Sequence, residues 1–159
     1  MASNSDAASS PNSVVRAEQV LRAIARLRDR DFSGVGLVFY ERLAHLPHLQ
    51  LTDSSVKADP GRFAELDLAI ALSSISVMGS PLHDGFHFVD VHRWELTHLS
   101  QFISPPIPSD AAKRFHGNGA RLMAALLTSL LPGIACVGLV TQGGEIHLFS
   151  HGNDATQKD

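Results

Sequence analysis

Residues 80–91 read Ser-Pro-Leu-His-Asp-Gly-Phe-His-Phe-Val-Asp-Val, and this stretch predicts where a central strand begins. Pro81 cannot continue a helix, because its ring fixes φ and it has no N–H group. Gly85 allows another group to approach the backbone closely. The alternation over residues 86–90 then has the period of a β-strand. Asp84 is therefore predicted to lie at the start of a strand.

Apolar periodicity on both sides of this stretch predicts a sheet with flanking helices. Helical spacing is found over residues 13–34, 59–77 (starting at Asp59-Pro60), 110–115 and 120–131. In the first of these helices the charged residues, Glu18 among them, fall outside the apolar face. Apolar or alternating runs predict strands over residues 35–40, 86–91, 96–103, 135–141 and 145–150, with a short strand over 49–52. We expect one α/β domain over residues 13–152, with a mixed central β-sheet flanked by helices, a disordered leader over 1–12 and a disordered tail over 153–159.

The composition is that of an ordinary folded domain and argues against several classes of function. Of the 159 residues, 44% are apolar and 18% are charged. The net charge of −3 argues against long nucleic acid as a partner, whereas a mononucleotide or cyclic dinucleotide needs only a few donors. No window reaches the ~20 apolar residues of a membrane span. The single cysteine, Cys136, lies in an apolar run that predicts a packed side chain, and we expect a cytoplasmic protein without a membrane partner.

Asp84 and His83 each have two interpretations from the residues alone. A carboxylate beside a glycine can bind a metal ion or accept a proton from a substrate hydroxyl, because a ligand can come close. The same aspartate can instead hydrogen-bond its own backbone in a turn. His83 can be a ligand or can fix the turn, and the nine histidines together show no closed metal-ligand spacing.

The segment Pro-Leu-His-Asp-Gly at residues 81–85 resembles that of the diadenylate cyclase domain, the family that condenses two ATP into cyclic di-AMP. A helix leads into this segment in the family too, and the family's first core strand, an apolar run ending in Glu-Arg, is similar to residues 35–42. The resemblance covers about residues 35–152 and implies a diadenylate-cyclase-like fold.

The resemblance also implies a site at this segment. In the family it contacts nucleotide, so His83, Asp84, Gly85 and Phe86 become candidate ligand-binding residues. Asp84 would bind Mg²⁺ or Mn²⁺ if the chain is catalytic, whereas sensing a nucleotide requires no cofactor. Phe86 replaces the family's usual small alanine and so puts a bulky ring where the family admits an adenosine.

A second candidate segment is Gly117-Asn118-Gly119-Ala120-Arg121, at the start of the predicted 120–131 helix. The family has Gly-Thr-Arg-His-Arg here, and that basic cluster binds triphosphate and assists the metal; only Arg121 matches its last arginine. A glycine-rich turn that opens a helix still presents free N–H groups to an anion, and Arg121 can add a bidentate contact. The alternative is a surface loop with an exposed arginine.

The third segment is Thr141-Gln142-Gly143, which stands where the family carries Ser-Glu-Glu between two strands. Thr141 is the candidate ligand-binding residue of this segment. An acidic group of the family is absent here, which weakens any scheme with two carboxylates around a metal.

Three functions follow from these patterns. The first is a nucleotide-sensing domain that has lost most synthetic residues, binds a cyclic dinucleotide or related nucleotide, and regulates a fused or neighbouring effector. The second is an active diadenylate cyclase that uses Asp84 with a divalent metal, which requires a homo-oligomer because two protomers must face each other. The third is a structural interaction module with a vestigial pocket.

Overall fold

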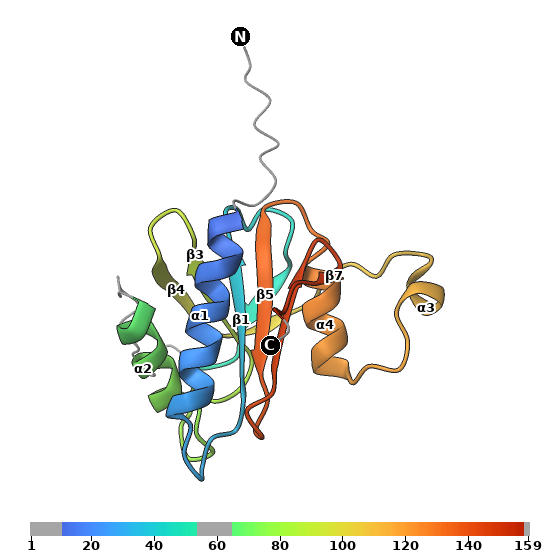
Figure 1. The fold of residues 1–159 in the computed structure, drawn as a ribbon. Helices are drawn as coiled ribbons and strands as arrows, with labels where there is room; N and C mark the ends of the chain where they lie inside the picture. The colour runs from blue at the N-terminus through green and yellow to red at the C-terminus, as the bar shows by residue number, and fades with distance from the viewer. Residues whose placement is uncertain (1–10, 54–64, 158–159) are drawn as a thin grey trace.

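The computed structural model describes residues 11–53 and 65–157, in which helices lie on both faces of a sheet (Figure 1). The helix start expected at Asp59 and Pro60 lies outside the described residues. The helices are α1 (Pro11–Leu27), α2 (Glu65–Ile75), α3 (Ala111–Arg114) and α4 (Ala120–Thr128). The strands are β1 (Val35–Tyr40), β2 (His48–Gln50), β3 (Phe86–Asp90), β4 (Glu95–Ile103), β5 (Ile134–Val140), β6 (Ile146–Ser150) and β7 (Asn153–Asp154).

The strands form one mixed sheet in the order β2-β4-β3-β1-β5-β6-β7. β1 runs parallel to β3, and the other neighbouring pairs are antiparallel. All six residues of β1 are buried, as expected for a continuous apolar strand covered on both faces. The sequence prediction of a mixed α/β sheet with flanking helices is confirmed. One consequence matters for the site: β1 and β3 begin, and β5 ends, at the same edge of the sheet.

The helices divide the core into two layers. α1 and α2 cover one face, where Leu21 and Leu72 belong to the same buried cluster as Phe39. α4 covers the other face, where Leu126 packs in a cluster with Val38 and other strand residues. Each fully buried leucine contributes about 1.5–3 kcal/mol relative to its exposed state, so both layers stabilise the sheet.

Several element ends differ from the sequence prediction. α1 begins at Pro11, inside the expected leader, and ends at Leu27 rather than near residue 34. The chain leaves the helix there because the Asp29 carboxylate accepts the Asp31 N–H (3.1 Å), a turn that competes with helix. α4 ends at Thr128 rather than at residue 131. Asp110 lies at the N-cap position of α3 but makes no capping hydrogen bond, and its carboxylate is 3.6 Å from Arg114 instead.

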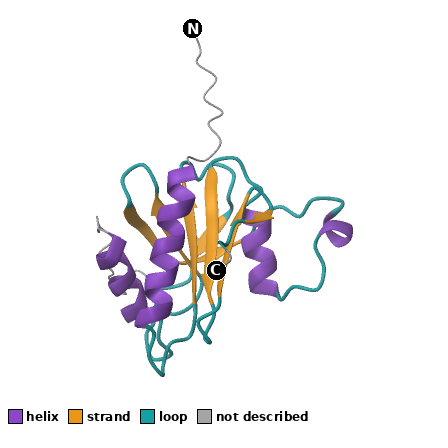
Figure 2. Cartoon of the chain, in the orientation of Figure 1, coloured by secondary structure: helices purple, strands orange, loops and turns teal. Residues whose placement is uncertain are grey.

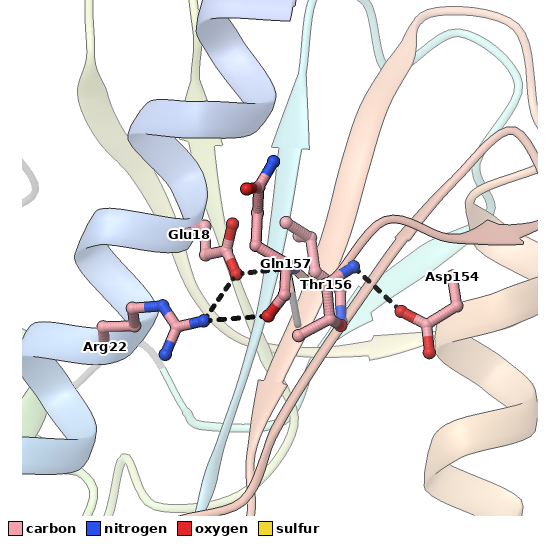
Figure 3. Close-up of polar contacts among 6 residues, drawn as sticks. Glu18, Arg22, Asp154, Thr156 and Gln157 are labelled. Carbon is pink, nitrogen blue, oxygen red and sulfur yellow. Dashed lines mark hydrogen bonds and ion pairs between the residues drawn. The ribbon is translucent and has the colours of Figure 1, made fainter. Parts of the chain in front are cut away.

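Of the disordered tail expected over residues 153–159, the described part, residues 153–157, is instead packed against α1 (Figure 3). After β7, the Gln157 N–H donates to Glu18 Oε1 (2.9 Å) and the Gln157 carbonyl accepts from Arg22 Nη2 (3.1 Å). Arg22 Nη2 also lies 3.1 Å from Glu18 Oε1, and Glu18 is only 5% exposed. Glu18 was expected outside the apolar face; it is buried because the tail covers it.

Residues 104–119 leave the sheet as loops that carry the single turn of α3 away from the rest of the domain (Figure 2). This excursion connects β4 to the start of α4. Among the helices that the structure describes, none has the length and apolarity that a membrane crossing needs.

Candidate functional site

Backbone from three parts of the chain meets the start of α4 at the edge where β1 and β3 begin and β5 ends. Gly34, just before β1, has φ +91°, which glycine adopts without strain. A Cβ added to Gly34 would lie 3.1 Å from the Val140 carbonyl oxygen, 3.5 Å from the Gln142 nitrogen and 3.3 Å from Arg121 Nη1. Gly34 is therefore in contact with both the end of β5 and the first turn of α4.

The turn before β3 is held by Ser80 and His83. The Ser80 carbonyl accepts from the His83 N–H (3.3 Å) and lies 2.7 Å from His83 Nδ1, and the Ser80 hydroxyl accepts from the Leu82 N–H (3.1 Å). His83 Nε2 is 3.5 Å from Asp84 Oδ1, while the Asp84 side chain is 75% exposed. His83 thus fixes the turn, one of its two interpretations, and lies beside a carboxylate that is open to solvent.

Gly85 follows this turn at a point where only glycine fits. Its φ is +80°, and an added Cβ would lie 2.7 Å from the Gln101 carbonyl oxygen and 3.0 Å from the Gln101 nitrogen. Both neighbours are backbone atoms of β4, which cannot rotate away as a side chain could. The close approach expected at this glycine is therefore an approach to β4.

Arg121, in the first turn of α4, reaches across to the sheet. Its Nη2 donates to the Gly85 carbonyl oxygen at 3.4 Å, and its Nη1 is the atom close to Gly34. The residue is exposed as a whole, but partial burial of the guanidinium lowers its pKa from the ordinary value, and the Asp84 carboxylate counteracts this. The structure therefore brings Arg121, Asp84 and Gly85 together, as the site prediction requires.

The loop before Arg121 is open. Gly117 has φ +82°, and a Cβ added at Gly117 or at Gly119 would meet no heavy atom within 4 Å. Asn118 is exposed between them. Gly119 occupies the N-cap position of α4 and no side chain caps this helix. The first N–H groups of α4 thus remain for water or an anion, because the first turn of any helix lacks intrahelical acceptors.

Two other candidate residues have structural roles. Phe86 is 5% exposed and its ring packs over Gly36, where an added Cβ would lie 2.6 Å from the ring. The Thr141 hydroxyl accepts the Glu145 N–H (3.0 Å), and the Thr141 carbonyl accepts the Gly144 N–H (2.9 Å). Phe86 is thus a core residue beneath the edge, and the Thr141 hydroxyl is engaged in the β5–β6 turn.

The residues that the structure describes do not form a set of three or more ligands for a metal. In the described part of the chain, no group of three or more His, Cys, Asp or Glu side chains could hold an ion. Asp84 would have to bind Mg²⁺ or Mn²⁺ as a single carboxylate. Cys136 is fully buried, as its apolar surroundings predict, and burial raises the pKa of its thiol well above the ordinary value.

A cavity of about 390 Å³ lies elsewhere, between the C-terminal ends of α1 and α2. Leu27, Asp29, Asp31 and Ile70 are among the residues that line it. None of the candidate site residues lies in its wall.

Comparison with known proteins agrees with this geometry at the level of the fold. No family model matches the sequence, and no curated protein matches it. Among solved structures, the crystal structure of DacA from Staphylococcus aureus, a double mutant, matches with a TM-score of 0.54 at 15% sequence identity. The match covers 90% of this chain and 84% of that chain. The chain folds like a diadenylate cyclase.

The diadenylate-cyclase-like fold places residues at the edge that sequence reasoning missed. The sequence prediction treated Gly34 only as a helix end. Gly34 directly precedes a buried strand, as Gly85 does, and this pattern predicts a close backbone approach at both positions. His87 was considered only among the nine histidines that show no closed metal-ligand spacing, although a histidine flanked by two phenylalanines in a strand predicts a buried polar group; it is 1% exposed. The contact between Gln101 and Gly85 had no signal in the sequence.

Proposed function

We propose that this chain is a nucleotide-binding sensor domain of diadenylate-cyclase-like fold, which binds the phosphates of a nucleotide or cyclic dinucleotide at the Asp84–Arg121 edge. We place this function in the cytoplasm, with the signal passed to an effector domain or protein. The observation that carries the proposal is the position of Arg121, whose guanidinium lies between Gly34 and Gly85 at the uncapped start of α4.

The chemistry of this edge suits a phosphate. A guanidinium has five N–H donors, and the bond to the Gly85 carbonyl uses one of them. The positive end of the α4 dipole and its first N–H groups add to the attraction for an anion. The partial burial that lowers the Arg121 pKa also strengthens an ion pair, because the local dielectric is lower than in water.

Sensing is favoured over synthesis by what the edge lacks. Gly119 and Ala120 stand in place of two basic residues of the family motif. Within the described residues, Asp84 belongs to no group of three or more His, Cys, Asp or Glu side chains that could hold a metal ion. Phosphoryl transfer depends on metal ions and positioned cations to neutralise developing charge, and one arginine supplies little of this.

Titration calorimetry with ATP, ADP and cyclic di-AMP tests the proposal. Arg121→Ala should weaken binding of the ligand by about 1.5–3 kcal/mol, the range for a hydrogen bond to a charged group, with the fold intact by circular dichroism. Arg121→Lys should recover only part of the affinity, because lysine keeps the charge but loses the planar fork. Arg114→Ala is the matched control, since it removes the same charge from the partly exposed Asp110 pair.

Two results would overturn the proposal. One is unchanged affinity in Arg121→Ala for a ligand that binds the wild type. The other is turnover: incubation with ATP and Mn²⁺ or Mg²⁺ should yield no cyclic di-AMP above background, and product formation abolished by Asp84→Asn would establish a cyclase instead. Mass spectrometry of any nucleotide that copurifies with the chain would identify the base and the number of phosphates.

A further inference from the structure

Ser100 in β4 has an unusual backbone for a buried residue. It is 0% exposed with φ +50°, a region that L-residues other than glycine adopt at a cost of about 1–2 kcal/mol. The register between β3 and β4 shifts at Ser100: Phe86 is opposite Gln101, whereas Phe88 is opposite His98. Two steps along β3 thus oppose three along β4, which is a β-bulge. Bulges often lie next to binding sites, where they redirect the strand.

His87 of β3 holds this bulge. Its Nδ1 lies 3.0 Å from the Ser100 nitrogen, so the imidazole accepts the Ser100 N–H and carries its own proton on Nε2. The Ser100 hydroxyl donates to the Leu82 carbonyl (3.1 Å), and the Ser100 carbonyl accepts the Leu51 N–H (2.9 Å). Ser100 therefore ties together β3, the turn before it and the segment after β2.

The bulge sets the position of the residue that touches the site. Gln101, next to Ser100, places its backbone against Gly85, at 2.7 Å and 3.0 Å from an added Cβ. The Gly85 carbonyl in turn accepts from Arg121. A continuous chain of contacts thus runs from His87 through Ser100, Gln101 and Gly85 to Arg121. Arg121 is the residue that we propose binds phosphate.

We propose that His87 is a positioning residue for the Asp84–Arg121 edge: as a neutral acceptor for the Ser100 N–H, it holds the bulge that fixes Gly85 against Arg121. The part of this inference that concerns nucleotide affinity rests on the proposed function. Burial, together with the positive charge of Arg121 on α4, lowers the pKa of His87 to about 4, which keeps the acceptor neutral at physiological pH.

The alternative is that His87 only fills space in the core. Two variants separate these roles. His87→Asn keeps an acceptor oxygen on the γ carbon, where Nδ1 is attached, but leaves a small void. His87→Leu keeps apolar bulk but leaves the buried Ser100 N–H without its acceptor, which costs about 1–3 kcal/mol. A space-filling role favours Leu over Asn in every measurement, whereas a positioning role favours Asn at the bulge and at the site.

The first readout needs no ligand. Amide exchange by NMR at pH 7 should show the Ser100 N–H exchanging about tenfold or more faster in His87→Leu than in His87→Asn, consistent with loss of one hydrogen bond. The chemical shifts of Gly85 and Arg121 should move more in the Leu variant than in the Asn variant. Equal exchange and equal shifts in the two variants would overturn the proposal.

The second readout is ATP affinity by calorimetry. His87→Leu should bind ATP about tenfold or more weakly than the wild type, and His87→Asn should stay within about threefold. Affinity that instead follows thermal stability would overturn the proposal and leave His87 as core. If the wild type binds no ATP, the ligand-free exchange and shifts still decide whether His87 positions the edge, while the ATP result counts against the proposed function.

Discussion

Two carboxylates of this chain occupy opposite situations, Glu18 on α1 and Asp84 before β3. Glu18 is 5% exposed and accepts from both Arg22 and the Gln157 N–H (Figure 3). Asp84 has a 75% exposed side chain, and its Oδ1 lies 3.5 Å from His83 Nε2. A buried carboxylate whose Oε1 already accepts two hydrogen bonds serves stability, because those bonds tie the tail to α1. An exposed carboxylate beside a partly buried arginine is available for a ligand.

The same contrast holds for the backbone around each group. Near Glu18, the C-terminal tail pairs with β6 through β7 and then hydrogen-bonds to α1. Around Asp84 two positive-φ glycines and a bulge at Ser100 hold the backbone in conformations that regular strands avoid. The strain at Ser100, which is not a glycine, persists only where surrounding contacts determine it, and such strain is enriched at functional sites.

Gly85→Ala should have the largest effect, a loss of about 2–5 kcal/mol in the free energy of unfolding. Strain at φ +80° contributes about 1–2 kcal/mol, and the contact with Gln101 backbone adds an overpacking term of about 1–3 kcal/mol. Gly117→Ala, with φ +82° but open space, should lose about 1 kcal/mol, and Gly79→Ala should lose almost none. Urea denaturation of the three variants checks the order; equal losses would show that the edge is not tightly packed.

Acid should destabilise the fold through His87. Its folded pKa of about 4 is below the unfolded value of 6.5, so the unfolded state binds more protons between these values and stability falls as pH falls. The loss should be about 2 kcal/mol between pH 7 and pH 5 and about 3 kcal/mol by pH 4.

Chemical denaturation across this pH range measures the effect of His87. His87→Leu should lose most of the pH 7 to pH 5 part of this dependence, because few carboxylates titrate there. Burial and the nearby His48 also lower the pKa of His98, so that residue accounts for the remainder. If the free energy of unfolding of His87→Leu fell between pH 7 and pH 5 as steeply as that of the wild type, a group other than His87 would be responsible for the acid sensitivity.

Much of this fold could be predicted from the sequence, because long segments with a regular apolar pattern dominate it. β1 matches its predicted range, and β3 and β4 differ from theirs by one residue at one end, since their apolar patterns are bounded by proline, glycine or charge. The order of the tail over residues 153–157 could not be predicted, because its contacts come from other parts of the chain. The Ala155 N–H donates to the Leu148 carbonyl, and the Gln157 N–H donates to Glu18, 139 positions away.

The site could be predicted only in part, because it too depends on contacts between distant parts of the chain. Asp84, Gly85 and Arg121 stand out by residue type, and the structure brings them together. The positions of Gln101 and Gly34 at the same edge depend on strand register and on the bulge at Ser100. Register is a tertiary property, so a local pattern does not reveal which backbone will lie beneath a given glycine.

Glu18→Ala should lower the free energy of unfolding by about 2 kcal/mol. It leaves the Gln157 N–H and the Arg22 guanidinium without their shared acceptor, and removing one partner of a buried hydrogen bond costs about 1–3 kcal/mol. Amide exchange should increase over residues 153–157 while the Asp84 edge is unaffected. Glu145→Ala is the matched control, because that side chain is 79% exposed and 3.9 Å from His147, and its removal should change stability by less than about 0.5 kcal/mol. Equal losses in the two variants would show that the tail contributes nothing.

Asp84→Asn should have the smallest effect on the fold, within about 0.5 kcal/mol, because the side chain is exposed and its contact with His83 is long. Its effect on the site should nevertheless be measurable. Asp84 raises the pKa of Arg121 by favourable charge interaction, so part of the guanidinium's charge is already compensated by this carboxylate. Removing that charge should leave Arg121 freer to attract phosphate, and metal-free ATP should then bind as tightly as to the wild type or more tightly. Thermal unfolding and calorimetry in the presence of EDTA measure the two quantities on the same variant. A large loss of stability would place Asp84 in the same class as Glu18, and weaker metal-free ATP binding would show that Asp84 contacts the ligand as a hydrogen-bonding partner.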